Sequence, residues 1–329
     1  MQRPVLSLII PIYNEEAIIA ELNRRLKDFL REMDETWEVV FVDDGSQDRT
    51  PEMLNEIAAV EPRYKVISFS RNFGHQAAIT AGMDRAEGDA VVIMDADLQE
   101  PPEVVTEMIQ KWREGYDVVY GQRSIRYGES IFKRVTAAAF YRLLRTLIPI
   151  EMPLDTGDFR LMSRRVVLSM RALREQHRFM RAIVSWLGFR QKAVQYERPE
   201  RFAGETKYPL RKMMGFAIDG ITSFSIVPLR LATWLGLFSG LVAIATSGWA
   251  LYAAIAGRTV PGWATIMIAV ALASSAQLIM TGILGEYVGR IYEEVKRRPL
   301  YVVADTLNLP STESSSATAE PSADTSPEY

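Results

Sequence analysis

Residues 91–102 read VVIMDADLQEPP, and this stretch decides the fold that we expect for the chain. Its first four residues are apolar and run directly into Asp95, Ala96 and Asp97. Such a short apolar run is typical of a buried parallel strand, and open α/β sheets bind ligands beyond the carboxyl ends of these strands. Asp95 and Asp97 point the same way on an extended chain, so they predict a site for a hard divalent cation, with Gln99 as a neighbouring polar group. An ordinary acidic turn before two prolines is the alternative.

Two other predicted strands are also followed by polar residues. These are residues 5–10, followed by Pro11, Tyr13 and Glu15, and residues 38–42, followed by Asp44. Further strands are expected at 65–69 and 117–120, and helical patterns separate the strands at 17–30, from residue 51, at 76–86 and at 102–114. Strands that alternate with helices predict an α/β fold with a mostly parallel sheet and helices on both faces. The polar strand ends would then line one crevice.

Composition excludes several classes of protein. The chain has 329 residues, enough for roughly two domains. It has no cysteine, which excludes disulfides and thiolate metal sites. The net charge is −3, and removing the five acids of residues 303–329 leaves +2 for the rest, so we expect no nucleic-acid partner. Neither G-x-G-x-x-G nor G-x-x-x-x-G-K-[ST] occurs, so the phosphate-binding loops of nicotinamide sites and P-loops are missing.

Several segments of the sequence resemble those of a known enzyme family. The segments PIYNEE, VDDGSQDRT, RNFGHQAAITAG, GDAVVIMDADLQEPPE and TGDFRLMSR resemble, in this order, those of polyprenyl-phosphate glycosyltransferases of family 2, which have the Rossmann-like GT-A fold. The likeness runs from residue 5 to about residue 300 and is greatest to bacterial bactoprenol glucosyltransferases, with dolichyl-phosphate mannose synthases as relatives. It implies inverting transfer of a hexose, with glucose as the expected sugar, from a UDP-sugar to polyprenyl phosphate. It also implies Mg²⁺ or Mn²⁺ as cofactor.

The resemblance also implies roles for individual residues. Those that match nucleotide-sugar contacts are Pro11, Tyr13 and Glu15 for the nucleoside, Asp44 for the base or ribose, and Asp95, Ala96, Asp97 and Gln99 for the diphosphate, with Asp95, Asp97 and Gln99 as metal ligands. Arg123 matches an arginine near the diphosphate or acceptor. Arg201 and Lys207 belong to a segment R-x-x-G-x-[ST]-K that closes over the diphosphate, although a basic linker before the membrane is the alternative.

On the acceptor side the resemblance points to Asp158, with Asp155 as the alternative. The nucleophile is a phosphate oxygen that is already anionic near neutral pH. It barely needs deprotonation, so we expect the acid to orient the acceptor rather than to act as a base. His75 is left open between a catalytic role, a donor-side contact and a structural role.

Two long uncharged stretches, residues 231–257 and 259–285, predict two transmembrane helices. Seven bases flank the pair on its outer sides and only Arg258 lies between the spans, so we expect the catalytic domain and both termini in the cytoplasm. The expected domains are a catalytic domain at 1–208 with an amphipathic interfacial helix at about 129–148, a juxtamembrane helix at 209–228, a transmembrane pair at 229–289, and a cytoplasmic segment at 290–329 that is disordered after about 309. Family likeness suggests a homo-oligomer, with a tetramer as the expected state.

Other functions remain open on the sequence alone. The same chemistry could use GDP-mannose or a UDP-aminoarabinose-type donor. A processive polysaccharide synthase lacks support because no Q-x-x-R-W motif is present. A non-catalytic scaffold would be expected to have lost the acids at the strand ends, which are all intact, and a nucleotidyltransferase would not obviously need two spans. The expected process is modification of cell-envelope glycans at the inner membrane.

Overall fold

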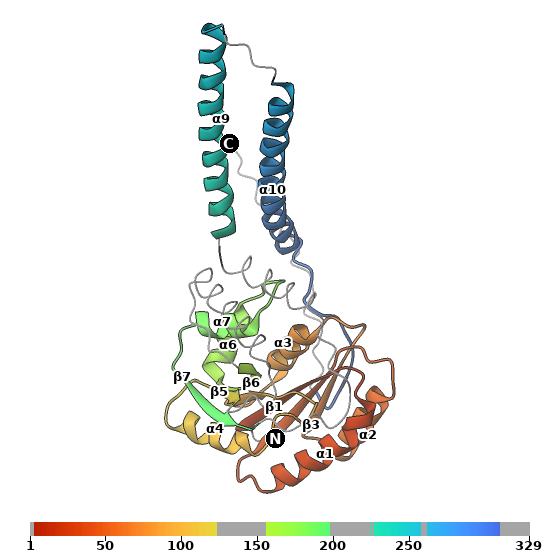
Figure 1. Ribbon diagram of the computed structural model, residues 1–329. Helices are drawn as coiled ribbons and strands as arrows, with labels where there is room; N and C mark the ends of the chain where they lie inside the picture. The colour runs from red at the N-terminus through yellow and green to blue at the C-terminus, as the bar shows by residue number, and fades with distance from the viewer. Residues whose placement is uncertain (1–2, 124–155, 198–224, 226, 258–261, 310–329) are drawn as a thin grey trace, which may run out of the picture.

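The computed structural model describes residues 3–123, 156–197, 225, 227–257 and 262–309. One sheet of eight strands forms the centre of the catalytic domain, in the order β7-β5-β6-β4-β1-β2-β3-β8 (Figure 1). The strands are β1 (Leu6–Ile12), β2 (Trp37–Asp43), β3 (Tyr64–Phe69), β4 (Ala90–Ile93), β5 (Val118–Arg123), β6 (Thr156–Ser163), β7 (Gln191–Tyr196) and β8 (Val303–Leu307). β4, β1, β2 and β3 are parallel neighbours, and β5 is parallel to β7. The prediction of a mostly parallel α/β sheet is therefore confirmed.

Helices cover both faces of this sheet, because successive residues of each buried strand point to opposite sides. Leu8 and Ile10 of β1 belong to one core, with α1 (Glu16–Arg31), α2 (Thr50–Val60) and α4 (Val104–Arg113). Ile9 belongs to the other, with α3 (His75–Arg85), α6 (Arg164–Ala172) and α7 (Met180–Trp186). Every residue of β1 is buried, and each large apolar side chain contributes about 1.5–3 kcal/mol.

A glycine brings α3 close to the sheet. A Cβ at Gly82 would lie 2.3 Å from Ile9 Cγ2, so any other residue there would force Ile9 or α3 to shift. The first turn of α3 carries His75 and Gln76. The position of both side chains therefore depends on this tight contact between helix and strand.

The sequence pattern does not predict β8. This strand pairs antiparallel with β3, and the chain on both sides of it is fixed by side chains. Tyr301 stacks on Phe69 with 5.0 Å between ring centroids, and its hydroxyl donates a 2.7 Å hydrogen bond to Asp84. Asn308 donates to the carbonyls of Ala58 and Tyr64. Residues 301–308 thus belong to the catalytic fold.

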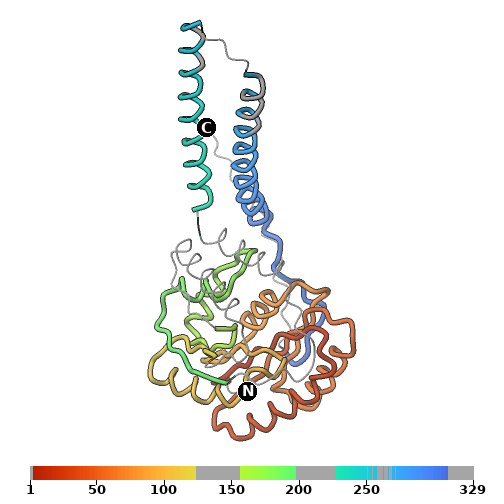
Figure 2. The backbone as a smooth tube through the Cα atoms, in the orientation of Figure 1, coloured from red at the N-terminus to blue at the C-terminus, as the bar shows by residue number. Residues whose placement is uncertain are grey.

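Two long helices, α9 (Val227–Ile255) and α10 (Trp263–Val295), rise side by side from the domain (Figures 1 and 2). At Gly236 of α9 a Cβ would lie 3.1 Å from Met280 Sδ of α10. Within the described residues, one helical stretch, Val227–Ala253, is long and apolar enough to cross a membrane, with a mean hydropathy of 1.6 and none of its most apolar window buried. The second predicted span is not confirmed. The predicted interfacial helix at 129–148, most of the juxtamembrane helix and the tail after 309 lie outside the described residues.

Candidate active site

The polar residues after β1, β2 and β4 meet at one edge of the sheet. β1 lies between the other two strands, with Ile12 opposite Asp43 and Ile9 opposite Ile93. Parallel pairing brings the carboxyl ends together, as expected from the sequence. This edge is therefore the candidate site.

Reciprocal hydrogen bonds join the turn after β1 to the turn after β2. Asn14 has a left-handed backbone with φ of 53°; its amide donates to Ser46 Oγ at 2.8 Å, and its side chain accepts from the Gln47 amide at 2.8 Å. The Glu15 amide donates to Thr50 Oγ1 at 3.0 Å. Pro11 is buried in β1, whereas Tyr13 is 43% exposed. The exposed ring next to this fixed turn is available to a nucleoside, and that role stays a prediction.

Asp44 has a structural contact that the sequence did not reveal. Its buried carboxylate accepts hydrogen bonds from the amides of Phe73, at 2.7 Å, and Gly74, at 2.9 Å. Burial raises the pKa of Asp44, and these two amide bonds oppose the rise. Asp44 therefore ties the loop before α3 to the end of β2, and its predicted contact with base or ribose remains untested.

The stretch MDADLQ forms a tight turn. Asp97 is 8% exposed and accepts a hydrogen bond from the Gln99 amide at 3.1 Å, while Leu98 between them has φ of 59°. Ala96 is buried. The Asp95 side chain is 36% exposed, and its Oδ1 lies 3.7 Å from His75 Nε2. The turn thus fixes Asp97 and leaves Asp95 partly exposed at this edge of the sheet.

Asp158, near the start of β6, lies in a ring of donors and cations. Its Oδ2 accepts from Gln76 Nε2 at 3.0 Å and lies 3.4 Å from His75 Nε2. Its Oδ1 lies 3.5 Å from Arg181 Nε and 3.9 Å from an Arg160 nitrogen. Burial alone would raise the pKa of Asp158, but the hydrogen bond from His75 and the charges of Arg181 and Arg160 hold it well below its usual range. Asp158 is therefore a carboxylate at any physiological pH.

Glu100 and Arg123 complete the cluster, and both side chains lie close to Gly157. A Cβ on Gly157 would lie 3.4 Å from Glu100 Oε1 and 3.5 Å from an Arg123 nitrogen. Glu100 is 2% exposed and accepts from the Asp95 amide at 2.9 Å. Burial, together with the charges of Asp95, Asp97 and Asp158, raises the pKa of Glu100 well above its usual value. Arg123 Nε is buried without a hydrogen-bond partner among the described residues.

The donor chemistry of this cluster fits a divalent cation. Asp95 and Asp97 offer hard oxygen ligands beside a third acid, and a cation there would offset the repulsion that acts on Glu100. The part of the chain that the structure describes holds no group of three or more His, Asp or Glu residues arranged around a metal. A two-carboxylate site of this kind matches Mg²⁺, which usually takes its remaining ligands from water and substrate phosphates.

Sequence reasoning missed four residues of the cluster: Gln76, Glu100, Arg160 and Arg181. Glu100 directly follows Gln99, and Arg160 lies two residues after Asp158, so proximity in sequence could have suggested both. Gln76 and Arg181 come from helices that only the fold brings to Asp158. Three predicted residues, Asp155, Arg201 and Lys207, lie outside the described residues.

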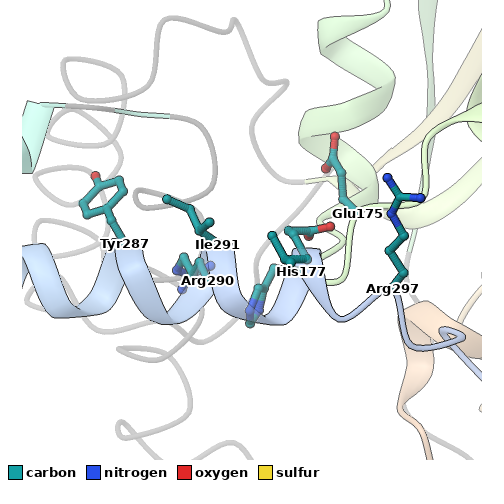
Figure 3. Close-up of a pocket in the computed structure, with 8 residues that line it drawn as sticks. Glu175, His177, Tyr287, Arg290, Ile291 and Arg297 are labelled. Atoms are coloured by element: carbon teal, nitrogen blue, oxygen red, sulfur yellow. The ribbon is translucent and has the colours of Figure 1, made fainter.

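A separate groove of about 480 Å³ lies where α10 meets residues 175–177, and its lining includes Glu175, His177, Tyr287 and Arg290 (Figure 3). His177 is 35% exposed and pairs with Glu293 at 2.6 Å. The amide of Gln176 donates to Glu294 at 2.7 Å. These contacts fix the end of α10 on the catalytic domain.

The fold and the acidic cluster at its strand ends define the chain as a glycosyltransferase of the GT-A class. More narrowly, it belongs to glycosyl transferase family 2, whose sequence profile matches residues 7–170. The chain is 51% identical over 304 residues to an uncharacterized glycosyltransferase, YkcC, of Bacillus subtilis, covering 92% of this chain and 94% of that protein. It is 40% identical over 299 residues to the SfII prophage-derived bactoprenol glucosyl transferase of Shigella flexneri, covering 91% and 97%.

Solved structures are more distant. The glucosyl-3-phosphoglycerate synthase of Mycobacterium tuberculosis, solved with Mn²⁺, uridine diphosphate and glucosyl-3-phosphoglycerate, is 19% identical and superposes with a TM-score of 0.45. The match covers 67% of this chain and 78% of that one.

Proposed function

We propose that this glycosyltransferase moves a hexose, with glucose as the expected sugar, from a UDP-sugar to polyprenyl phosphate at the cytoplasmic leaflet of the plasma membrane. The observation that supports polyprenyl phosphate as the acceptor is the 40% identity to a bactoprenol glucosyl transferase over 97% of that protein's length. Both the catalytic domain and the two long helices fall within this similarity. The product would be a lipid-linked sugar for modification of cell-envelope glycans.

The described cluster supports a direct displacement. The acceptor phosphate is already anionic, so its oxygen can attack the anomeric carbon without a base, and attack opposite the leaving diphosphate inverts that carbon. The strongly ionised Asp158 fits an orienting role better than proton abstraction. Arg123, with its Nε unpaired in the described part of the chain, can stabilise the charge on the leaving diphosphate.

Mg²⁺ or Mn²⁺ is the cofactor that we propose, held by Asp95 and Asp97 with Gln99 as the predicted third ligand. A bound cation would supply charge neutralisation at the diphosphate. Within the described residues, the Gln99 amide supports the Asp97 carboxylate from the backbone side. Tyr13 and Glu15 beside β1 would receive the nucleoside, and Arg201 and Lys207 would close over the diphosphate.

We also propose that both long helices span the membrane. α10 has 33 residues, and apolar side chains such as Leu272, Leu278 and Ile279 are exposed on it. The bases on the outer flanks of the pair are Arg211, Lys212, Arg230, Arg290, Lys296, Arg297 and Arg298. Their excess over Arg258 supports a cytoplasmic location for the catalytic domain and both termini. A homo-oligomer, with a tetramer as the expected state, and the domain boundaries given above complete the proposal.

The test is to incubate membranes that contain the protein with polyprenyl phosphate and a panel of labelled UDP- and GDP-sugars. We expect the label of UDP-glucose to enter the lipid phase in a single sugar-lipid product. Label from GDP-mannose or a UDP-aminoarabinose donor alone would replace the donor assignment. Label in a polymer would favour a polysaccharide synthase, and no incorporation from any donor would contradict the proposed function.

A further inference from the structure

Gln76 has a place in the active site that neither the sequence motifs nor the family assignment explains. It lies in the first turn of α3, beside His75. Its side-chain amide makes two hydrogen bonds: Nε2 donates to Asp158 Oδ2 at 3.0 Å, and Oε1 accepts from the Met180 amide at 3.1 Å. One side chain therefore joins α3 to β6 and to α7.

The second of these bonds fixes the orientation of the first. The Met180 backbone N–H can only donate, so the amide oxygen of Gln76 must face it. The NH₂ group then faces Asp158, which as a carboxylate can only accept. The amide thus has one orientation, and it presents a donor to Asp158.

The two carboxylate oxygens of Asp158 consequently differ in their hydrogen bonding. Oδ2 is held by Gln76 and His75. Oδ1 is buried and accepts no hydrogen bond from the described residues, with Arg181 Nε 3.5 Å away. An ionised oxygen without hydrogen bonds is costly to bury, so it is the atom that a hydrogen-bond donor on a bound substrate would satisfy.

We infer that Gln76 is a positioning residue that anchors Asp158 by its Oδ2 and directs Oδ1 toward the substrate. The inference rests on the proposed function, because it assigns the task of orienting the acceptor to Asp158. Gln76 itself touches no substrate in this scheme. Its bond to Met180 ties the orientation of Asp158 to α7, which directly follows the loop that holds α10 through Gln176.

Two substitutions at this position separate its two hydrogen bonds. Gln76→Met has a similar shape and loses both bonds. Gln76→Glu keeps an oxygen for the Met180 amide but turns a carboxylate toward Asp158. We expect both variants to lower kcat on the order of 10- to 100-fold with little change in donor KM, because the acceptor-orienting group is misplaced. Gln110→Met, the same substitution at an exposed position of α4, is the control and should keep wild-type turnover.

A double-substitution cycle completes the test. In an Asp158→Asn background, Gln76→Met should change kcat by less than about twofold, because both substitutions remove the same function. Wild-type turnover in Gln76→Glu would show that only the Met180 bond matters and would overturn the inference. Independent, multiplying losses in the double variant would also overturn it. If the wild-type protein transfers no sugar to lipid from any donor, the proposed function fails first and the inference fails with it.

Discussion

Asp158 is held ionised by the residues around it, and this state decides what its substitution should do. Asp158→Asn preserves the shape of the side chain but removes the charge that we propose orients the acceptor. We expect kcat to fall on the order of 10²-fold or more, while the dissociation constant of the UDP-sugar changes only a few-fold. Steady-state kinetics and calorimetric donor titration measure the two quantities separately. Equal losses in turnover and donor binding would contradict an acceptor-side role.

Asp97 tests the proposed metal site. Asp97→Ala should reduce transfer to background, a loss on the order of 10²–10³-fold at least, because the diphosphate loses its counter-charge. The alanine also removes the acceptor for the Gln99 amide, so Asp97→Asn is the matched variant that retains it. Mn²⁺ should raise the thermal midpoint of the wild-type protein and leave that of Asp97→Asn unchanged. Near-normal turnover in either variant would refute the metal assignment.

The buried Glu100 carboxyl should make the stability of the protein depend on pH when divalent cations are absent. Its pKa in the folded protein is raised, so the unfolded chain ionises first and the free energy of unfolding falls as pH rises above the unfolded pKa. Glu100→Gln removes this effect. We expect the variant to gain stability relative to wild type as the pH rises above about 5 in thermal unfolding with EDTA. A constant difference between the two proteins over that range would argue against the raised pKa.

The sequence could predict only those residues of the candidate site that lie at strand ends. Asp95 and Asp97 follow a short apolar run that is typical of a buried strand, so the pattern predicted their place at the sheet edge. Gln76 lies in the segment RNFGHQAAITAG, 82 residues before Asp158, and the segment alone gives it no role. Arg181 lies in a basic stretch of ordinary appearance. Their role depends on tertiary contact, which periodicity does not encode.

At the scale of the elements, the parallel core was predicted and the added strands were not. β1 and β2 are wholly buried and are mostly apolar, with Ser7 in β1 and Glu38 and Asp43 in β2 as the polar exceptions. β8, with the sequence VADTL, contains one acid and a threonine and is largely exposed, so it lacks the signal of a strand. Its partner β3 lies more than two hundred residues earlier, and only that pairing makes it a strand.

The contribution of β8 can be measured by shortening the chain. Ending it after Arg298 should lower the thermal midpoint by about 5 °C or more, because the burial of Tyr301 and the pairing with β3 are lost. Ending it after Leu309 is the control and should leave the midpoint unchanged.

A single substitution examines the same contact more gently. Tyr301→Phe keeps the stack on Phe69 and removes the hydrogen bond to Asp84, so the free energy of unfolding should fall by about 1 kcal/mol.

For the truncation experiment, equal thermal midpoints for the two shortened chains in detergent would mean that β8 does not support the fold.

For the whole molecule, the absence of cysteine provides a direct test of topology. Ala256→Cys places a thiol at the far end of α9, and Ala304→Cys places one in β8. If both long helices span the membrane, an impermeant maleimide should label Ala256→Cys in intact spheroplasts and Ala304→Cys only after the membrane is opened. Labelling of both thiols, or of neither, in intact spheroplasts would contradict two spans with a cytoplasmic catalytic domain.

The place of β8 at the end of the chain also affects how the molecule is made. A ribosome that has finished the parallel core has not yet synthesised α9, α10 or the strand that covers β3. During that interval β3 presents an unpaired edge, which is a ready template for pairing with another chain. If both long helices insert as proposed, β8 follows them along the chain and returns to pair with β3. The fold is then completed only after insertion, and a chain that has not yet made β8 retains an unpaired edge at β3.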